Sequence, residues 1–113
     1  MHEMSIAMNI IEIATEEAYK ANTAKFSRII LDIGSLSGVE LDALEFAMES
    51  AKKATVLDGA DVQINYIQAR ARCRQCGHEF GVDSIFNICE KCQNYDLEII
   101  QGKEMKIKSL ILE

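Results

Sequence analysis

Two pairs of cysteines constrain the fold of this chain more than any other feature of its sequence. Cys73 and Cys76 form one CxxC motif, Cys89 and Cys92 form a second, and the chain contains no further cysteine. Short CxxC turns at this spacing can direct four thiolates at one point, which is the geometry of a tetrahedral zinc site. Four such ligands leave no open position for a catalytic water. The motif therefore predicts a zinc-stabilised fold and argues against a zinc hydrolase.

Composition narrows the class of protein around this motif. The length of 113 residues corresponds to about one domain. No apolar run approaches the roughly 20 residues that span a bilayer, and the start lacks the basic region and long apolar stretch of a signal peptide. We therefore expect a cytoplasmic location, where paired cysteines bind metal more often than they form disulfides. The formal net charge of −6 argues against general binding to nucleic acid, which depends on lysine and arginine.

The hydrophobic pattern predicts two helices and three strands outside the cysteine segment. Apolar residues recur at helical spacing from Met4 onwards, and Ser37 followed by Glu40 is a capping-box pattern that would open the second helix. Alternating apolar residues such as Val62 and Ile64 indicate half-buried strands. A strand, a helix and a strand in succession favour a crossover between parallel strands. The expected helices are 4–21 and 39–53, and the expected strands are 25–33, 61–69 and 104–112.

These elements predict an α+β fold in which a small mixed three-stranded sheet is flanked by two helices. A four-cysteine zinc module, with knuckles of the zinc-ribbon or rubredoxin type, is inserted between the second and final strands. We assign residues 1–69 plus 97–113 to the α/β body and residues 70–96 to the module. A turn at Gly102 leaves a hairpin as an alternative connection to the final strand.

Zinc is the expected ion at the cysteines, and iron is the alternative. Cys-x-x-Cys-Gly knuckles also bind iron in a tetrahedral thiolate site, and Gly77 follows Cys76 in this way. Gln93 takes the matching position in the second motif, although glycine accepts the positive φ of such knuckles more readily. We interpret His78 as a surface residue or a hydrogen-bond donor to a thiolate, with replacement of a ligand as the alternative.

The N-terminus is the second unusual feature. The amine of Met1, the amide nitrogen of His2 and the His2 ring can close adjacent chelate rings around one metal ion, and the amide nitrogen of Glu3 could supply a fourth corner. Four nitrogen donors in a plane suit Ni(II) or Cu(II). The first N–H groups of a helix lack partners within the helix, which leaves these amides free to bind. The alternative is that His2 is simply an exposed residue at the end of the chain.

Taken together, these features resemble the HypA/HybF family, the nickel metallochaperones of nickel–iron hydrogenase maturation. The resemblance covers essentially the whole chain, and the Met-His-Glu start together with the cysteine quartet makes it specific. The second CxxC of many family members carries proline and glycine around it, whereas Glu90 and Gln93 stand here. The segments that carry the resemblance are 1–5, 30–34, 39–41, 71–80, 89–92 and 102–109.

The resemblance implies a carrier of metal and not an enzyme. His2 would be the principal nickel ligand, assisted by the Met1 amine and nearby backbone nitrogens, and the four cysteines would hold structural zinc. The protein would pass Ni(II) to the large subunit of nickel–iron hydrogenase by ligand exchange, working with the maturation GTPase HypB. Similar proteins also supply urease in some bacteria.

Other functions and the oligomeric state stay open at this point. A zinc-ribbon module that binds nucleic acid or a transcription complex is the main alternative, although the acidic charge counts against it. A rubredoxin-like electron carrier is a second alternative, and it would be visibly coloured. The sequence is compatible with either a monomer or a dimer.

Overall fold

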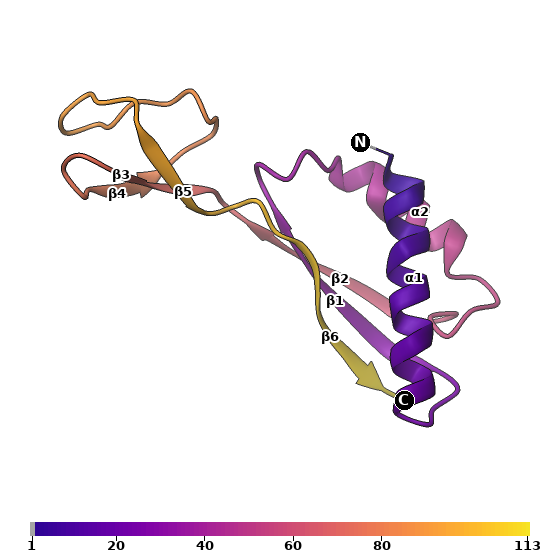
Figure 1. The fold of residues 1–113 in the computed structure, drawn as a ribbon. Helices are drawn as coiled ribbons and strands as arrows, with labels where there is room; N and C mark the ends of the chain where they lie inside the picture. The colour runs from indigo at the N-terminus through magenta and orange to yellow at the C-terminus, as the bar shows by residue number, and fades with distance from the viewer. Residues whose placement is uncertain (1) are drawn as a thin grey trace. The chain divides into compact units, whose positions relative to one another are not determined.

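The computed structural model describes residues 2–113, which form two compact units. The first, here called the helical unit, comprises Met1–Leu31, Val39–Asn65 and Lys106–Glu113. The second, here called the cysteine unit, comprises Asp32–Gly38 and Tyr66–Met105. The elements of both units are labelled in Figure 1. Each unit has its own small core, so each must be stabilised largely by its own contacts.

Two amphipathic helices pack together in the helical unit. Helix α1 spans Glu3–Lys20 and α2 spans Leu41–Ala51, and the two are in contact. The buried stripe of α1 is made largely of alanines, which allow a neighbouring helix to approach closely. No helix in the described part of the chain is long and apolar enough to cross a membrane. The buried residues are Ala7, Ile10, Ala14 and Ala18 in α1 and Leu44, Ala47 and Met48 in α2.

The start of α2 differs from the prediction. Its N-cap is Glu40, whose carboxylate accepts a hydrogen bond from the N–H of Asp42 at 3.2 Å. The predicted capping box, with Ser37 as the cap, is therefore wrong. The N–H of Ser37 donates to the carbonyl oxygen of Gly34 at 3.1 Å, so this residue lies in the turn that follows the preceding strand. Glu40 caps the helix because its own side chain reaches a free N–H group of the first turn.

A mixed three-stranded sheet accompanies the helices. Strands β1 (Phe26–Gly34), β2 (Asp61–Ile67) and β6 (Met105–Leu112) are arranged in the order β2-β1-β6. The central strand buries Ile29, Leu31 and Ile33 on one face, as the period of two requires. Strands β1 and β2 run in the same direction and β6 runs against them (Figure 1). The predicted crossover between parallel strands is therefore present.

The cysteine unit contains a second, antiparallel sheet. Strands β3 (Arg70–Cys73), β4 (Glu79–Gly81) and β5 (Leu97–Gln101) are arranged in the order β4-β3-β5. Strands β5 and β6 belong to different sheets, so the turn at Gly102 does not close a hairpin. The predicted α+β class is confirmed, with two helices, a mixed three-stranded sheet and a small sheet that holds the four cysteines.

The segment after β1 belongs to the cysteine unit, although it leads directly into α2. The N–H of Gly34 donates to the carbonyl of Glu104 at 2.8 Å, and the N–H of Leu36 donates to the carbonyl of Gly102 at 2.7 Å. The hydroxyl of Ser35 accepts from the N–H of Ala69 at 2.8 Å. These bonds tie the end of β1 and the turn after it to the rest of the cysteine unit.

Candidate metal centre

The four cysteines lie together at one end of the small sheet. Their sulfur atoms all lie within 4.8 Å of one another, and none forms a disulfide. Cys73 and Cys92 are 3.5 Å apart, sulfur to sulfur, and Cys76 and Cys89 are 3.6 Å apart. Each close pair joins one cysteine of the first motif to one of the second, so both motifs are needed to assemble the site.

The two motifs form turns with the same backbone hydrogen bonds. We call residues 73–78 the first knuckle and residues 89–94 the second. The N–H of Cys73 donates to the carbonyl of His78 at 2.9 Å, and the N–H of Cys89 donates to that of Asn94 at 2.8 Å. The fifth residue of each knuckle has a positive φ, +80° at Gly77 and +64° at Gln93. Gln93 thus adopts the conformation expected of glycine, at the modest energetic cost that a side chain pays there.

Backbone amides favour ionised sulfur at the first cysteine of each knuckle. The N–H of Cys76 points at the sulfur of Cys73, and that of Cys92 at the sulfur of Cys89, both at 3.5 Å. These amides are the main cause that lowers the pKa of Cys73, and they lower the pKa of Cys89 to about 6. Both residues are therefore prepared to act as thiolate ligands.

The fourth cysteine shows why the cluster requires a cation. The amide of Asn94 favours the thiolate of Cys92, but the contact with the sulfur of Cys73, burial, and the contacts with the other two cysteines outweigh it and raise the pKa of Cys92 to about 12. Adjacent negative charges repel, so four thiolates coexist only when a metal ion compensates them.

The arrangement fits a tetrahedral metal ion with four sulfur ligands. Zinc–sulfur bonds of about 2.3 Å place neighbouring sulfurs about 3.8 Å apart, close to the two distances of 3.5 and 3.6 Å. Four thiolates without oxygen or nitrogen donors suit zinc or iron. The four cysteines thus form a metal-binding cluster.

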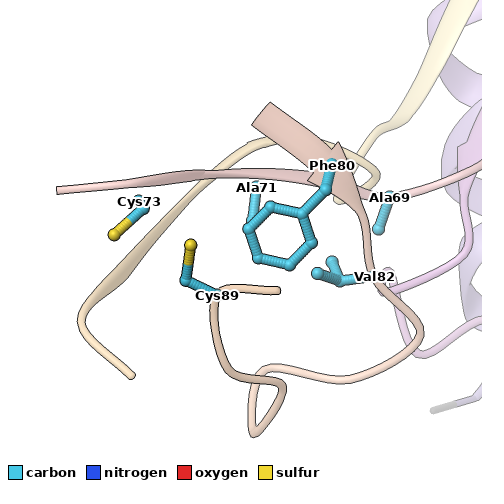
Figure 2. Packing of buried hydrophobic residues seen from close by; sticks show 6 residues of the cluster. All are labelled: Ala69, Ala71, Cys73, Phe80, Val82 and Cys89. Carbon is cyan, nitrogen blue, oxygen red and sulfur yellow. The ribbon is translucent and has the colours of Figure 1, made fainter. Parts of the chain in front are cut away.

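A small core supports the cluster from one side. Phe80, Ala71, Ala69 and Val82 are buried together with Cys73 and Cys89, and Figure 2 shows the aromatic ring among them. Cys76 and Cys92 are exposed. The first cysteine of each knuckle is therefore anchored in the core, whereas the fourth residue of each lies at the surface. A core of this size needs the additional stabilisation that a metal ion gives.

His78 contacts a carboxylate across the cluster. Its Nε2 lies 2.7 Å from Oε1 of Glu90, and its ring stacks on Phe80 with 5.5 Å between the ring centroids. This contact joins the end of the first knuckle to the interior of the second. Its partner was not identifiable from the sequence, because a histidine carries no local signal of the acceptor that it will meet.

The predicted nickel site at the N-terminus is only partly within the described residues. His2 is the N-cap of α1, is exposed and makes no side-chain capping bond. The predicted contribution of the Met1 amine lies outside the described residues. Among the residues that the structure describes, the cysteines are the one group of three or more histidine, cysteine or acidic side chains that could hold a metal.

A hydrogen bond between Glu3 and Glu40, next to His2, was not predicted from the sequence. The carboxylate of Glu3 accepts a hydrogen bond from the N–H of Glu40 at 3.1 Å, so the start of α1 is tied to the cap of α2. This bond, followed by one from the amide of Glu3 itself, lowers the pKa of the Glu3 carboxyl. No sequence pattern pairs residues so far apart. The amide of Glu3 would have to leave its carboxylate to serve as the fourth nitrogen around nickel.

Comparison with known proteins places these features in one family. A family profile described as hydrogenase/urease nickel incorporation, metallochaperone, hypA matches residues 1–112. The hydrogenase maturation factor HypA of Geotalea uraniireducens is 39% identical over 113 residues, covering 100% of both chains. That of Nostoc punctiforme is 42% identical, covering 100% of this chain and 96% of the relative.

Solved structures agree in fold. The solution structure of the Ni metallochaperone HypA from Helicobacter pylori has a TM-score of 0.71 at 29% identity, covering 99% of this chain and 97% of that one. A second solution structure of a HypA protein has a TM-score of 0.75 at 29% identity, covering 100% and 97%.

Proposed function

The chain belongs to the HypA family of nickel-incorporation metallochaperones, and we propose that it carries Ni(II) for assembly of the nickel–iron hydrogenase active site. The single observation that carries this proposal is the family match over residues 1–112. The family is described as serving urease as well as hydrogenase, so urease is a second candidate recipient. The function of this chain is to deliver a metal ion, and it catalyses no reaction of its own.

His2 is the principal nickel ligand in this proposal. Its side chain is exposed and its backbone is extended (φ −86°, ψ 96°). The ring makes no capping hydrogen bond to the helix. The N–H of Ile6 donates to the carbonyl of His2 at 3.2 Å, so the amide of His2 lies before this bond. The amide of Glu3 would first have to leave its own carboxylate. The Met1 amine and the amide nitrogens of His2 and Glu3 complete a planar set of donors that suits nickel.

Such a site suits transfer. Incoming ligands from a partner can attack an open, planar ion at the surface, so the metal moves by ligand exchange. Nickel affinity should fall as pH falls, because the amine, the imidazole and the amides must lose protons to bind. The partners in this proposal are the maturation GTPase HypB and the hydrogenase large subunit, and the expected location is the cytoplasm. A role for membranes or nucleic acid is not part of the proposal.

The cysteine cluster holds structural zinc in this proposal. The spacing of the sulfurs fits the ion, and four protein ligands fill its coordination sphere. The ion would link the two knuckles and stabilise a core that is small on its own. Nickel would thus be the transported metal, and zinc would remain bound as the structural one.

A two-metal titration tests the proposal, using protein with an unmodified N-terminus. We expect one tightly held zinc and one exchangeable nickel per chain. His2→Ala, or extra residues placed before Met1, should abolish nickel binding and leave zinc in place. Asn9→Ala, at an exposed position of α1, is the control, and it should bind nickel normally.

The same variants should be compared in cells that lack their own protein of this family. The unmodified chain should restore hydrogenase maturation, and His2→Ala should not. Full nickel binding by His2→Ala would overturn the proposed site. Normal nickel binding without restored maturation would overturn hydrogenase as the recipient.

A further inference from the structure

Two side-chain bridges join the knuckles in a reciprocal pattern. His78, the sixth residue of the first knuckle, bonds to Glu90, the second residue of the second knuckle, at 2.7 Å. Asn94, the sixth residue of the second knuckle, donates from Nδ2 to Oε1 of Gln75, the third residue of the first. Each knuckle therefore ends in a side chain that binds an inner residue of the other.

We propose that these two bridges form a clasp that slows loss of the resident metal and its replacement by nickel. The clasp comprises His78, Glu90, Gln75 and Asn94. The inference rests on the proposed metal at the cysteines and on nickel as the cargo. It assigns a positioning role to four residues that are not metal ligands.

The geometry of the sulfurs explains why the knuckles must stay together. The close pairs Cys73–Cys92 and Cys76–Cys89 both cross between knuckles. Separating the knuckles therefore removes half of the coordination sphere at once. Cys76 and Cys92 are the exposed residues of the cluster, so we expect an incoming ligand to approach the ion from their side. The clasp bridges connect the same two knuckles and resist this opening.

The clasp residues are also held in place themselves. The ring of His78 stacks on the buried Phe80, with 11° between the ring planes. The side chain of Asn94 also accepts from the N–H of Asp96 at 2.6 Å. Both sixth residues are thus pre-positioned for their partners, which reduces the entropy lost when the bridges form. The outer ion pair of Arg74 and Asp96, at 3.3 Å, is exposed and adds little.

Nickel makes kinetic protection useful in this protein. Nickel(II) also binds nitrogen and sulfur ligands, so an excess of nickel can occupy thiolates from which the structural ion has been lost. A carrier that binds nickel and also holds four thiolates risks exchange of the structural ion. A clasp that slows opening keeps the transported metal out of the structural site without any change in the ligands.

The rate at which a chelator removes zinc from the full chain tests whether the clasp slows metal loss. Glu90→Ala and Gln75→Ala should each release zinc about fivefold faster, which corresponds to the loss of a hydrogen bond worth about 1 kcal/mol. Glu90→Gln and Gln75→Glu retain an acceptor oxygen and should stay near the unmodified rate. Lys91→Ala is the matched control, because it lies in the second knuckle and its side chain takes no part in either bridge.

Double variants distinguish specific bridges between the knuckles from a general destabilisation of the cysteine unit. His78→Ala combined with Glu90→Ala should release zinc little faster than either single variant, whereas Gln75→Ala combined with Glu90→Ala should multiply their effects. Under a challenge with excess Ni(II), the alanine variants should also gain nickel–thiolate absorption faster. Zinc content and the far-UV circular dichroism spectrum should be unchanged at the start.

The outcomes distinguish the clasp from the proposed function. Release from Glu90→Ala and Gln75→Ala at the rate of Lys91→Ala would overturn the clasp and leave the zinc site intact. Multiplying effects within the His78–Glu90 pair would also overturn it. Absence of one bound metal per chain in the unmodified protein would instead refute the proposed metal site itself.

Discussion

Replacing Gly34 with alanine should destabilise the cysteine unit strongly, although this glycine is far from the cysteines in sequence. A Cβ atom at position 34 would lie 2.0 Å from the carbonyl oxygen of Gly102 and 2.6 Å from the amide nitrogen of Lys103. These are backbone atoms, so no side chain can rotate away. The two segments must separate by about 1 Å or more to reach van der Waals contact.

That separation has a calculable cost. The bonds from Gly34 to Glu104, at 2.8 Å, and from Leu36 to Gly102, at 2.7 Å, would lengthen beyond hydrogen-bond range. Each lost bond costs about 1 kcal/mol, and the steric strain adds about 1–3 kcal/mol. We therefore expect Gly34→Ala to lower the free energy of unfolding of this unit by about 3–5 kcal/mol.

Urea unfolding of cobalt-substituted protein measures this loss, since cobalt–thiolate absorption reports on the cysteine unit alone. The control is Gly81→Ala in β4, where the nearest atom to an added Cβ is 3.9 Å away. That variant should change stability by less than about 1 kcal/mol. Equal unfolding midpoints for the two variants would refute the close backbone packing inferred at Gly34.

Three further predictions concern other parts of the chain. In α2, Leu44→Ala should lower the free energy of unfolding by about 2–5 kcal/mol, because Leu44 is fully buried. Phe46→Ala should lower it by about 0.5 kcal/mol or less, because Phe46 is 74% exposed. Similar losses for the two variants in urea unfolding would contradict the packing of this helix. The lowered pKa of Glu3, caused first by the N–H of Glu40, gives stability that is complete above about pH 4.3 and lost as pH falls through the folded pKa. The amide signal of Glu40 in NMR spectra should follow this titration below pH 4.3, and a midpoint at or above that pH would argue against the bond. Removing metal with a chelator should unfold the cysteine unit and leave the helical circular dichroism of α1 and α2 largely intact; loss of both together would show that the units do not fold separately.

Local patterns in the sequence were sufficient for the helices and most strands. The helical period places Ala7, Ile10 and Ala14 on one buried stripe, and the period of two places Ile29 and Leu31 on the buried face of β1. Such patterns depend on residues a few positions apart, so the sequence carries them directly. The spacing within each CxxC motif is also a pattern of residues a few positions apart, so it too can be read from the sequence.

The predicted strand boundaries were wrong where contacts between residues far apart in sequence decide the local structure. The predicted strand 61–69 ends at Ile67, and the chain enters a different sheet at Arg70. Between these strands the N–H of Ala69 donates to Ser35, and its carbonyl accepts from Val82. These partners lie far away in sequence, and they decide where one strand ends and the next begins.

The sequence by itself determined that four cysteines would form a metal site, because the count and spacing of ligands are local properties. Only the tertiary structure decided that each close sulfur pair crosses between knuckles and that His78 meets Glu90 while Asn94 meets Gln75. It likewise decided the bond between Glu3 and Glu40. Polar side chains accept many partners of similar energy, so the folded backbone selects among them by distance and direction.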